Sequence, residues 1–308
     1  LLAMPITLLV VAWCLSLLKN RLRWNGKFYW ANLLITIGVG ALIVGSLRPT
    51  NTWDLPVFLV LAMMSLGYSI LKNLNLKFEK KTTILPGTSR KIILAILLVL
   101  GFAILAILFY EPFSYWYGAG YTSVMPWQGS RTPINSYVLH WGIFLALILE
   151  WFGHEAIQWM ASVPVSALRK LIPYRVWIYV GIALTVFALV GLLAAGVSII
   201  VVALPLAIWA GLLLLRNQQS DVKRFLFFIT GTALFLTIAV EVIVLEGDIG
   251  RMNTVFKFYL QAWNLFAIAA AAGLTWFVSR LMTAEDNRNS DSILLTIFSI
   301  LLVSGLLL

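Results

Sequence analysis

Long apolar runs alternate with short polar segments along the whole chain. Ten of these runs are long enough for a helix that crosses a bilayer, which needs about 20 predominantly apolar residues. They cover residues 1–18, 29–46, 55–72, 92–110, 135–153, 176–195, 197–215, 225–245, 259–279 and 292–308. The pattern predicts an all-α fold, a polytopic transmembrane bundle of about ten helices.

The region 176–215 allows two interpretations, because only Gly196 and its neighbours interrupt its apolar character. It is either one very long helix or two helices joined by a tight hairpin, which Gly191, Gly196 and Pro205 support. The basic residues favour the hairpin. A single helix would move the last two basic loops to the opposite side of the membrane and break their alternation.

Composition narrows the class of protein. Hydrophobic residues make up 61% of the chain and charged residues 11%, whereas an ordinary soluble domain has about 25% charged residues. We therefore interpret residues 1–308 as a single transmembrane domain with no room for a soluble one. The chain begins inside an apolar run at Leu1, without an initiator methionine, and ends inside another. We expect it to be the C-terminal part of a longer polypeptide.

The formal charge of +10 does not indicate a nucleic-acid partner, because the basic residues are spread over separate loops. Cys14 is the single cysteine and is accompanied by two histidines, His140 and His154. This supply is too small for a disulfide or a multi-cysteine metal site, and too small for most other transition-metal sites. No metal is predicted, and the sequence identifies no cofactor.

Basic residues also predict orientation. Alternate loops hold 18 of the 22 lysines and arginines, and such loops face the cytoplasm. The predicted cytoplasmic loops are 19–28, 73–91, 154–175, 216–224 and 280–291. We expect a multi-pass protein of the plasma membrane, with membrane lipids as partners and outer loops at 47–54, 111–134 and 246–258.

The strongest local signal lies where the eighth predicted helix leads into the ninth. Asn253, Lys257, Gln261 and Asn264 recur at spacings of four, four and three, which places them along one helical face. Together with Arg251, Lys257 suits a phosphate or carboxylate ligand, because a guanidinium group binds it in a bidentate way and an ammonium group acts as a point charge.

Outer carboxylates are the candidates for catalysis, namely Glu241, Asp54 and Asp248. Glu241 near the end of its helix suits a general base or a structural counter-ion. The alternative for Lys257 is an ion pair with Glu241 or Asp248. Asp54 equally suits a cap at the start of the third predicted helix.

Three further segments supply candidate binding residues. Asn51 and Trp53 precede Asp54 in the outer loop, and Trp53 also fits an interfacial aromatic belt. Arg131 precedes the fifth predicted helix. His140 lies two turns into that helix, where it can bond a ligand, coordinate a pigment or bond a neighbouring helix. We expect Asn51 to Asp54, Arg131 and Arg251 to Lys257 to gather at one outer mouth, where polar groups satisfy one another or share a ligand.

Three segments, taken in chain order, resemble the signature segments of the YYY-motif membrane proteins, the domain of unknown function 2298 family. They read NTWDLP (51–56), RTPINSYVLHWGIF (131–144) and RMNTVFKFYLQAW (251–263). The resemblance implies a GT-C-like fold. GT-C membrane glycosyltransferases take sugars from polyprenyl-phosphate carriers on the outer side of the membrane. It also implies that the segment giving the family its name lies upstream of Leu1.

The leading hypothesis is a GT-C-like membrane glycosyltransferase, or its membrane portion, that uses a polyprenyl-phosphate-linked sugar on the extracytoplasmic side. The alternative is a non-catalytic structural subunit of a larger membrane complex. A third hypothesis is a lipid or anion transporter. Transport favours polar residues through the whole bilayer depth, whereas most of the predicted helices lack charge at mid-membrane.

Overall fold

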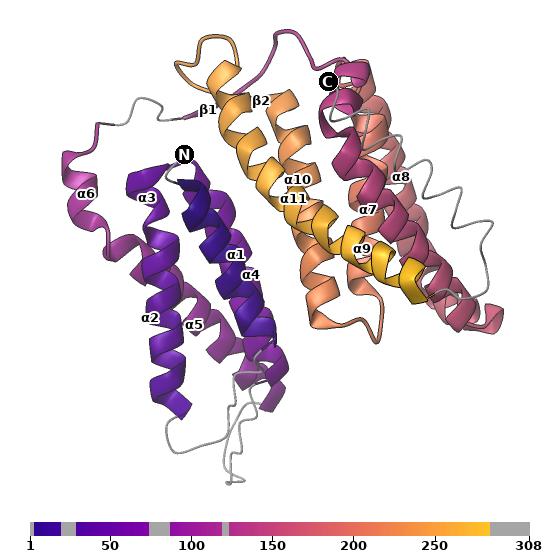
Figure 1. The fold of residues 1–308 in the computed structure, drawn as a ribbon, viewed down its shortest axis with the longest axis horizontal. Coiled ribbons are helices and arrows are strands. Elements are labelled where there is room, and N and C mark those ends of the chain that lie inside the picture. Colours follow the sequence, from indigo (N-terminus) through magenta and orange to yellow (C-terminus); the bar gives the residue numbers. More distant parts are fainter. Residues whose placement is uncertain (1–2, 20–28, 74–86, 119–122, 284–308) are drawn as a thin grey trace. The chain divides into compact units, whose positions relative to one another are not determined.

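The computed structural model describes residues 3–19, 29–73, 87–118 and 123–283 (Figure 1). The chain divides into two compact units. Residues 1–122 and 220–225 form the first unit, and residues 123–219 and 226–308 form the second. Helix α10 (Asp221–Val242) therefore begins in the first unit and continues in the second.

Apolar helices build the first unit. The long ones are α1 (Ala3–Lys19), α2 (Tyr29–Gly45), α4 (Asp54–Asn73) and α5 (Gly87–Leu108), and the short ones are α3 (Leu47–Thr50) and α6 (Glu111–Trp116). Close packing depends on glycine in α2, because a Cβ atom at Gly40 would lie 2.2 Å from the ring of Trp13 in α1. The Trp13 ring in turn stacks on Phe102 of α5, with ring centroids 5.3 Å apart. The glycine thus lets α2 approach α1 closely.

An ion pair joins α4 to the start of α10. Lys72, in the last turn of α4, contacts the carboxylate of Asp221 at 2.5 Å. The hydroxyl of Tyr68 donates to the same carboxylate at 2.8 Å. Asp221 is the first residue of α10, where a negative charge also favours the helix dipole.

The second unit combines long helices with a small β-ribbon. Besides most of α10, its elements are β1 (Val124–Pro126), α7 (Ile134–Ser162), the 3-10 helix η1 (Val165–Tyr174), α8 (Arg175–Ala194), α9 (Ile200–Leu215), β2 (Ile243–Leu245) and α11 (Met252–Thr283). Strands β1 and β2 pair antiparallel, with Val124 opposite Leu245 and Pro126 opposite Ile243. The ribbon therefore joins the loop before α7 to the loop before α11.

Aromatic side chains fill the core of the second unit. Trp151 of α7 is buried and stacks on Phe227 of α10 at a centroid distance of 4.5 Å. Trp141, about three turns earlier on α7, packs edge-on against Phe266 of α11 at 5.2 Å. Gly273 of α11 allows this helix to pack closely on α7, because a Cβ atom at this position would lie 3.3 Å from Trp151. Aromatic burial thus fixes α7 between α10 and α11.

Polar contacts mark both ends of the second unit. At one end, the hydroxyl of Ser198, in the α8–α9 hairpin, donates to the carbonyl of Thr132 at 3.1 Å. At the other end, Arg280 contacts Glu150 at 2.5 Å and Arg216 contacts Glu155 at 3.3 Å. These pairs join the second half of α7, beside the aromatic core, to the ends of α11 and α9.

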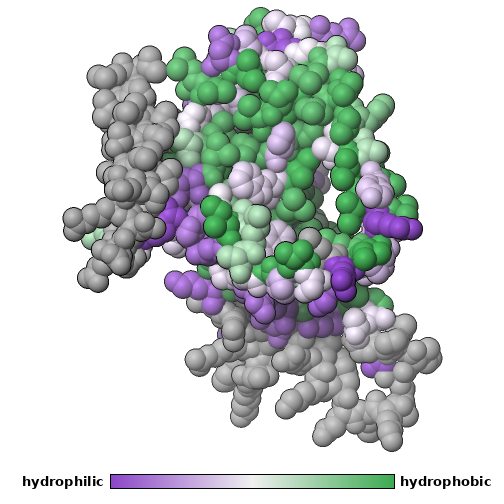
Figure 2. Space-filling view, turned by 90° about the vertical axis from the view of Figure 1, so that its right-hand side faces the viewer, coloured by the Kyte–Doolittle hydropathy of each residue, from purple (hydrophilic) through white to green (hydrophobic). Residues whose placement is uncertain are grey.

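The surface fits a lipid environment. Within the described part of the chain, seven helices are long and apolar enough to cross a membrane, and α1 and α9 are shorter apolar helices. Helix α8 has no buried residue, and its exposed side chains include Trp177 and Phe187. The face in Figure 2 shows apolar side chains across the middle and polar ones toward the ends. The chain is an integral, multi-pass membrane protein.

The predicted spans from 1–18 to 259–279 each contain a helix, and the last, 292–308, lies outside the described residues. The all-α polytopic bundle is confirmed. The hairpin between α8 and α9 is also confirmed, with Gly196 at φ +83° in the turn, whereas Gly191 and Pro205 lie inside the helices.

Three boundaries differ from the sequence prediction. The run 225–245 ends as a strand rather than as a helix, because residues 243–245 pair with β1. Helix α11 begins at Met252 instead of near 259. Helix α7 continues to Ser162, well into the predicted loop 154–175. In α7 and α11, the extra turns are polar or mixed in composition, so hydropathy alone did not include them.

Candidate functional site

A buried carboxylate organises the ribbon end of the second unit. Glu241 lies in the last turn of α10 and is 0% exposed. Its carboxylate accepts hydrogen bonds from the backbone N–H of Thr132 at 3.0 Å and from the Thr132 hydroxyl at 2.6 Å. Arg251 forms a salt bridge with it at 2.8 Å. Three groups from two distant loops thus converge on one side chain.

Two arginines surround this carboxylate. Arg251 also donates to the carbonyl of Val240 at 2.7 Å and to the hydroxyl of Thr132 at 3.0 Å. Arg131 donates to the backbone carbonyl of Glu241 and, at 2.7 Å, to that of Trp127. We call Arg131, Thr132, Glu241 and Arg251 the arginine cluster. Its two positive charges face one negative charge, so the cluster carries one excess positive charge.

The ion pair of the arginine cluster is largely buried. The side chain of Arg251 is 13% exposed and its partner Glu241 is 0% exposed. An ion pair in such surroundings is held in place because separating it would leave an uncompensated buried charge, at a cost of about 3–5 kcal/mol. The cluster is therefore rigid, and its net charge favours an anion at the partly exposed edge of the guanidinium groups.

Asp248 has a different role, because the start of α11 uses its carboxylate. One oxygen accepts from the backbone N–H and the side-chain amide of Asn253, at 3.2 and 3.1 Å. The other accepts from the backbone N–H and hydroxyl of Thr254, both at 2.8 Å. Gly247 and Gly250 flank it at φ +83° and +63°, a conformation that glycine adopts without strain. The sequence EGDIG is thus a turn followed by a helix cap.

Partial burial acts to raise the pKa of Asp248, but the hydrogen bonds from Thr254 and Asn253 outweigh it and hold the pKa below its ordinary value. The ionised form is the one that accepts four hydrogen bonds. Asp248 is therefore a fixed negative charge at neutral pH and a poor proton acceptor.

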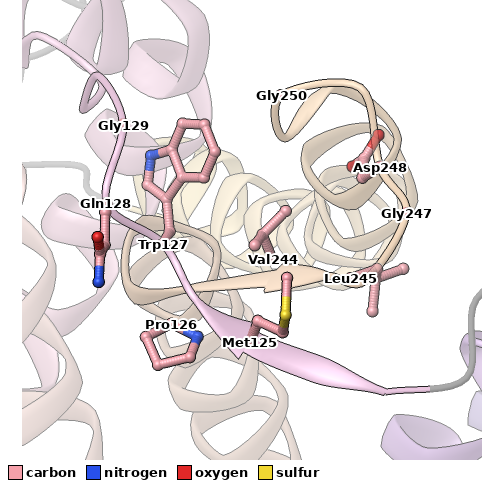
Figure 3. A pocket seen from close by; sticks show the side chains of 10 residues that line it. All are labelled: Met125, Pro126, Trp127, Gln128, Gly129, Val244, Leu245, Gly247, Asp248 and Gly250. Carbon is pink, nitrogen blue, oxygen red and sulfur yellow. The ribbon is translucent and has the colours of Figure 1, made fainter.

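An open pocket of about 520 Å³ adjoins the cluster. The ribbon and the turn 247–250 surround it, and Figure 3 shows the indole of Trp127 rising beside Val244 toward that turn. Arg251 lies over the Trp127 ring, with the guanidinium carbon 5.7 Å from the ring centroid. Trp127 therefore borders both the pocket and the arginine cluster. The volume falls within the range of about 300–1,000 Å³ that is typical of small-molecule sites.

The predicted polar stripe lies on α11. Asn253 and Lys257 are half-buried in its first turns, and Gln261 and Asn264 are buried further along. The stripe therefore runs from the pocket end of α11 into the helix bundle. Asn253 belongs to the cap around Asp248, whereas Lys257 and Gln261 are still proposed as ligand-binding residues.

His140 contacts a neighbouring helix. Its ring packs edge-on against Trp141 at a centroid distance of 4.5 Å and lies 5.8 Å from the ring of Tyr259 in α11. The side chain is exposed. Of the roles considered for His140, contact between α7 and α11 is the one that these distances describe.

The remaining predicted residues lie in the first unit. Asn51 ends α3, and its carbonyl accepts a hydrogen bond from the backbone N–H of Asp54 at 2.9 Å. Asp54 is the first residue of α4 and is buried, as expected for a residue at a helix start. Trp53 lies in the turn between them and is half-buried. Their proximity to Arg131 and Arg251 stays a prediction.

Sequence reasoning brought Arg131, Glu241 and Arg251 forward but assigned no role to Thr132, Trp127 or Gln128. The β-ribbon places the last two at the pocket. Its one sequence signal was the β-branched run Val242–Val244 at the end of an apolar helix, which favours a strand. Across the described ranges, no group of three or more His, Cys, Asp or Glu side chains is placed to hold a metal ion.

Comparison with known proteins gives one match. No curated protein and no solved structure matches the chain. A model of an uncharacterized membrane protein family, DUF2298, matches residues 1–266. The match covers both loops that form the arginine cluster and the pocket. The chain belongs to this family of membrane proteins, DUF2298.

Proposed function

We propose that the chain is the membrane portion of a GT-C-like glycosyltransferase that binds a polyprenyl-phosphate-linked sugar on the extracytoplasmic side. The observation that carries the proposal is the excess positive charge of the arginine cluster beside an open pocket. A lipid-linked phosphosugar has the matching features, because its phosphate is anionic and its sugar projects from the membrane surface.

The guanidinium groups have donors available for such a phosphate. Each guanidinium group carries five N–H donors. Within the described residues, hydrogen bonds use three of them in Arg251 and two in Arg131. Glu241 holds the two groups in position, and Lys257 in the first turns of α11 adds a further positive charge. Charge-assisted bonds of this type are about twice as strong as neutral ones.

The proposed chemistry is transfer of the sugar from phosphate to an acceptor hydroxyl. The acceptor oxygen bonds to the anomeric carbon while the bond from that carbon to the phosphate oxygen breaks, and a base takes the hydroxyl proton. Preorganised arginines stabilise the charge that develops on the departing phosphate. Glu241 and Asp248 are engaged in the hydrogen bonds described above, and the assignment of Asp54, the third candidate carboxylate, as the base stays a prediction.

The test measures binding of a bare polyprenyl phosphate to the purified protein in nanodiscs. Arg131→Gln removes one charge of the cluster without leaving Glu241 isolated, since Arg251 keeps its salt bridge. Binding should weaken by tenfold or more, about the worth of one charged hydrogen bond. Arg169→Gln, at an exposed arginine of η1, is the matched control and should bind as the wild type does.

The melting temperature without lipid separates this function from the second candidate, a structural subunit of a larger membrane complex. The closed hydrogen bonding of Glu241 and Asp248 favours that candidate. A structural role predicts no lipid binding by the wild-type protein and a lower melting temperature for Arg131→Gln. Unchanged lipid binding in this variant would contradict the phosphate site.

A further inference from the structure

The pocket beside the arginine cluster has a chemistry of its own. Apolar side chains supply part of its wall, namely Met125, Pro126 and Val244. Its polar lining residues are Gln128 and Asp248. No lysine or arginine is among its lining residues, although two arginines lie next to it. The pocket is thus a mixed apolar and polar space that carries a negative charge.

This composition selects against a phosphate inside the pocket. The Asp248 carboxylate is ionised at neutral pH, and a second anion at short range would be repelled. A neutral ligand with one apolar face and several hydroxyl groups fits better. An aromatic face and aliphatic groups contact the carbon skeleton of such a ligand, and amide and backbone groups bond its hydroxyls.

Trp127 is held as a fixed wall between the pocket and the arginine cluster. Its indole N–H donates to the carbonyl of Ser130 at 2.9 Å. The ring also packs so closely on Gly129 that a Cβ atom there would lie 2.1 Å from it. Arg251, a member of the arginine cluster, lies over the same ring. A ligand that reaches both compartments must therefore pass along this indole.

We infer that the site has two compartments, in which the pocket takes the uncharged sugar ring of the ligand and the arginine cluster takes its phosphate, with Trp127 as the shared wall. This inference rests on the proposed function and adds to it the residues that distinguish a sugar-bearing lipid from a bare one. We assign the specificity to Gln128, because it is the exposed neutral polar residue among those that line the pocket.

The experiment compares two ligands in nanodiscs, a polyprenyl phosphate and the same lipid carrying one neutral hexose. Wild-type protein should bind the hexose-bearing lipid about tenfold more tightly, as expected for one or two additional hydrogen bonds. Gln128→Ala should lose most of this preference while its affinity for the bare lipid stays unchanged. Trp127→Phe, which keeps an aromatic ring but lacks the indole N–H, should show a partial loss. Gln158→Ala, at an exposed glutamine of α7, is the matched control.

The outcomes separate the inference from the proposed function. Equal affinity of wild-type protein for the two lipids overturns the two-compartment site and leaves the proposed function standing. Equal weakening of both lipids in Gln128→Ala also overturns it, because the side chain would then act on the shared phosphate part. Binding of neither lipid overturns the proposed function and the inference together.

Discussion

The two carboxylates at the pocket end of the second unit contribute in different ways. Glu241 is fully buried and joins Arg251 to Thr132. Asp248 is half-buried and binds the first residues of α11. The first holds positive charge in place for a ligand, whereas the second holds a helix end in place. The sequence made both of them candidates for catalysis, because each is a carboxylate in a segment predicted to lie on the outer side.

Asp248→Ala should lower the free energy of unfolding by about 1 kcal/mol, since it removes the cap of α11. The effect should depend on pH. The pKa of Asp248 is lower in the folded protein than its ordinary value of 3.8. Its stabilising contribution is therefore present at neutral pH and is lost as the pH falls through the lowered pKa. Denaturation in detergent should show a larger loss of stability from about pH 7 to about pH 3 in wild type than in the variant.

Asp248→Asn is the control for this prediction. Asparagine does not titrate, so this variant should lose the pH dependence. Its single side-chain oxygen can replace only one of the two acceptor oxygens of Asp248, so the variant should keep only part of the capping stability. Parallel pH profiles for all three proteins would show that Asp248 does not act through its charge.

The charged residues of the candidate site could be predicted from the sequence, because their side-chain type already indicates what they can bind. Glu241 is a carboxylate inside a predicted span, where a charged group needs a partner or a ligand, and Arg251 follows it in the next loop. Their mutual contact was one of several pairings that the sequence allowed. Thr132 was not assignable, because a threonine before a helix has many ordinary roles. Thr132 and Glu241 are 109 residues apart in the sequence, so their hydrogen bonds form only in the folded protein.

Among the elements, the β-ribbon decides where the site lies. Its strands have only three residues each, too short to show a period of two in the sequence. Hydropathy therefore assigned residues 243–245 to the preceding helix. The long helices were predictable, because each shows about 20 apolar residues and polar ends. Their boundaries in α7 and α11 depend on tertiary contacts and capping, which hydropathy does not record.

A disulfide cross-link tests the ribbon. Met125 and Val244 lie directly opposite each other, so their Cα atoms should be about 4.5–5.5 Å apart, within the range that a disulfide bridges. Met125→Cys combined with Val244→Cys should cross-link readily on mild oxidation, detected by gel mobility after proteolysis between the two sites. Val124→Cys with Ile243→Cys is the control, because these positions are diagonal and further apart. Equal cross-linking of both pairs would contradict the register.

At the scale of the whole molecule, each unit has apolar helices between polar ends. In the second unit, the ribbon, the α8–α9 hairpin and the start of α11 meet at one end. The ion pairs of Glu150 and Glu155 lie at the other end. The alternation of basic loops in the sequence predicts that these two ends face opposite sides of the membrane, because lysine and arginine counts report insertion rather than packing. This sidedness stays a prediction.

The orientation itself is testable with two single-cysteine additions in the second unit. Ser130 lies in the loop beside the ribbon and Lys170 lies in η1, and both side chains are exposed. Native Cys14 is 0% exposed, so wild-type protein should stay unlabelled. We expect Ser130→Cys to react with a membrane-impermeant maleimide on intact cells, because its loop belongs to the face poor in basic residues. Lys170→Cys should react only after permeabilisation, because Arg169 and Arg175 keep its loop on the cytoplasmic side. The reverse pattern would place the arginine cluster in the cytoplasm and contradict an extracytoplasmic lipid-linked donor. Labelling of both positions from outside would contradict an odd number of crossings between them.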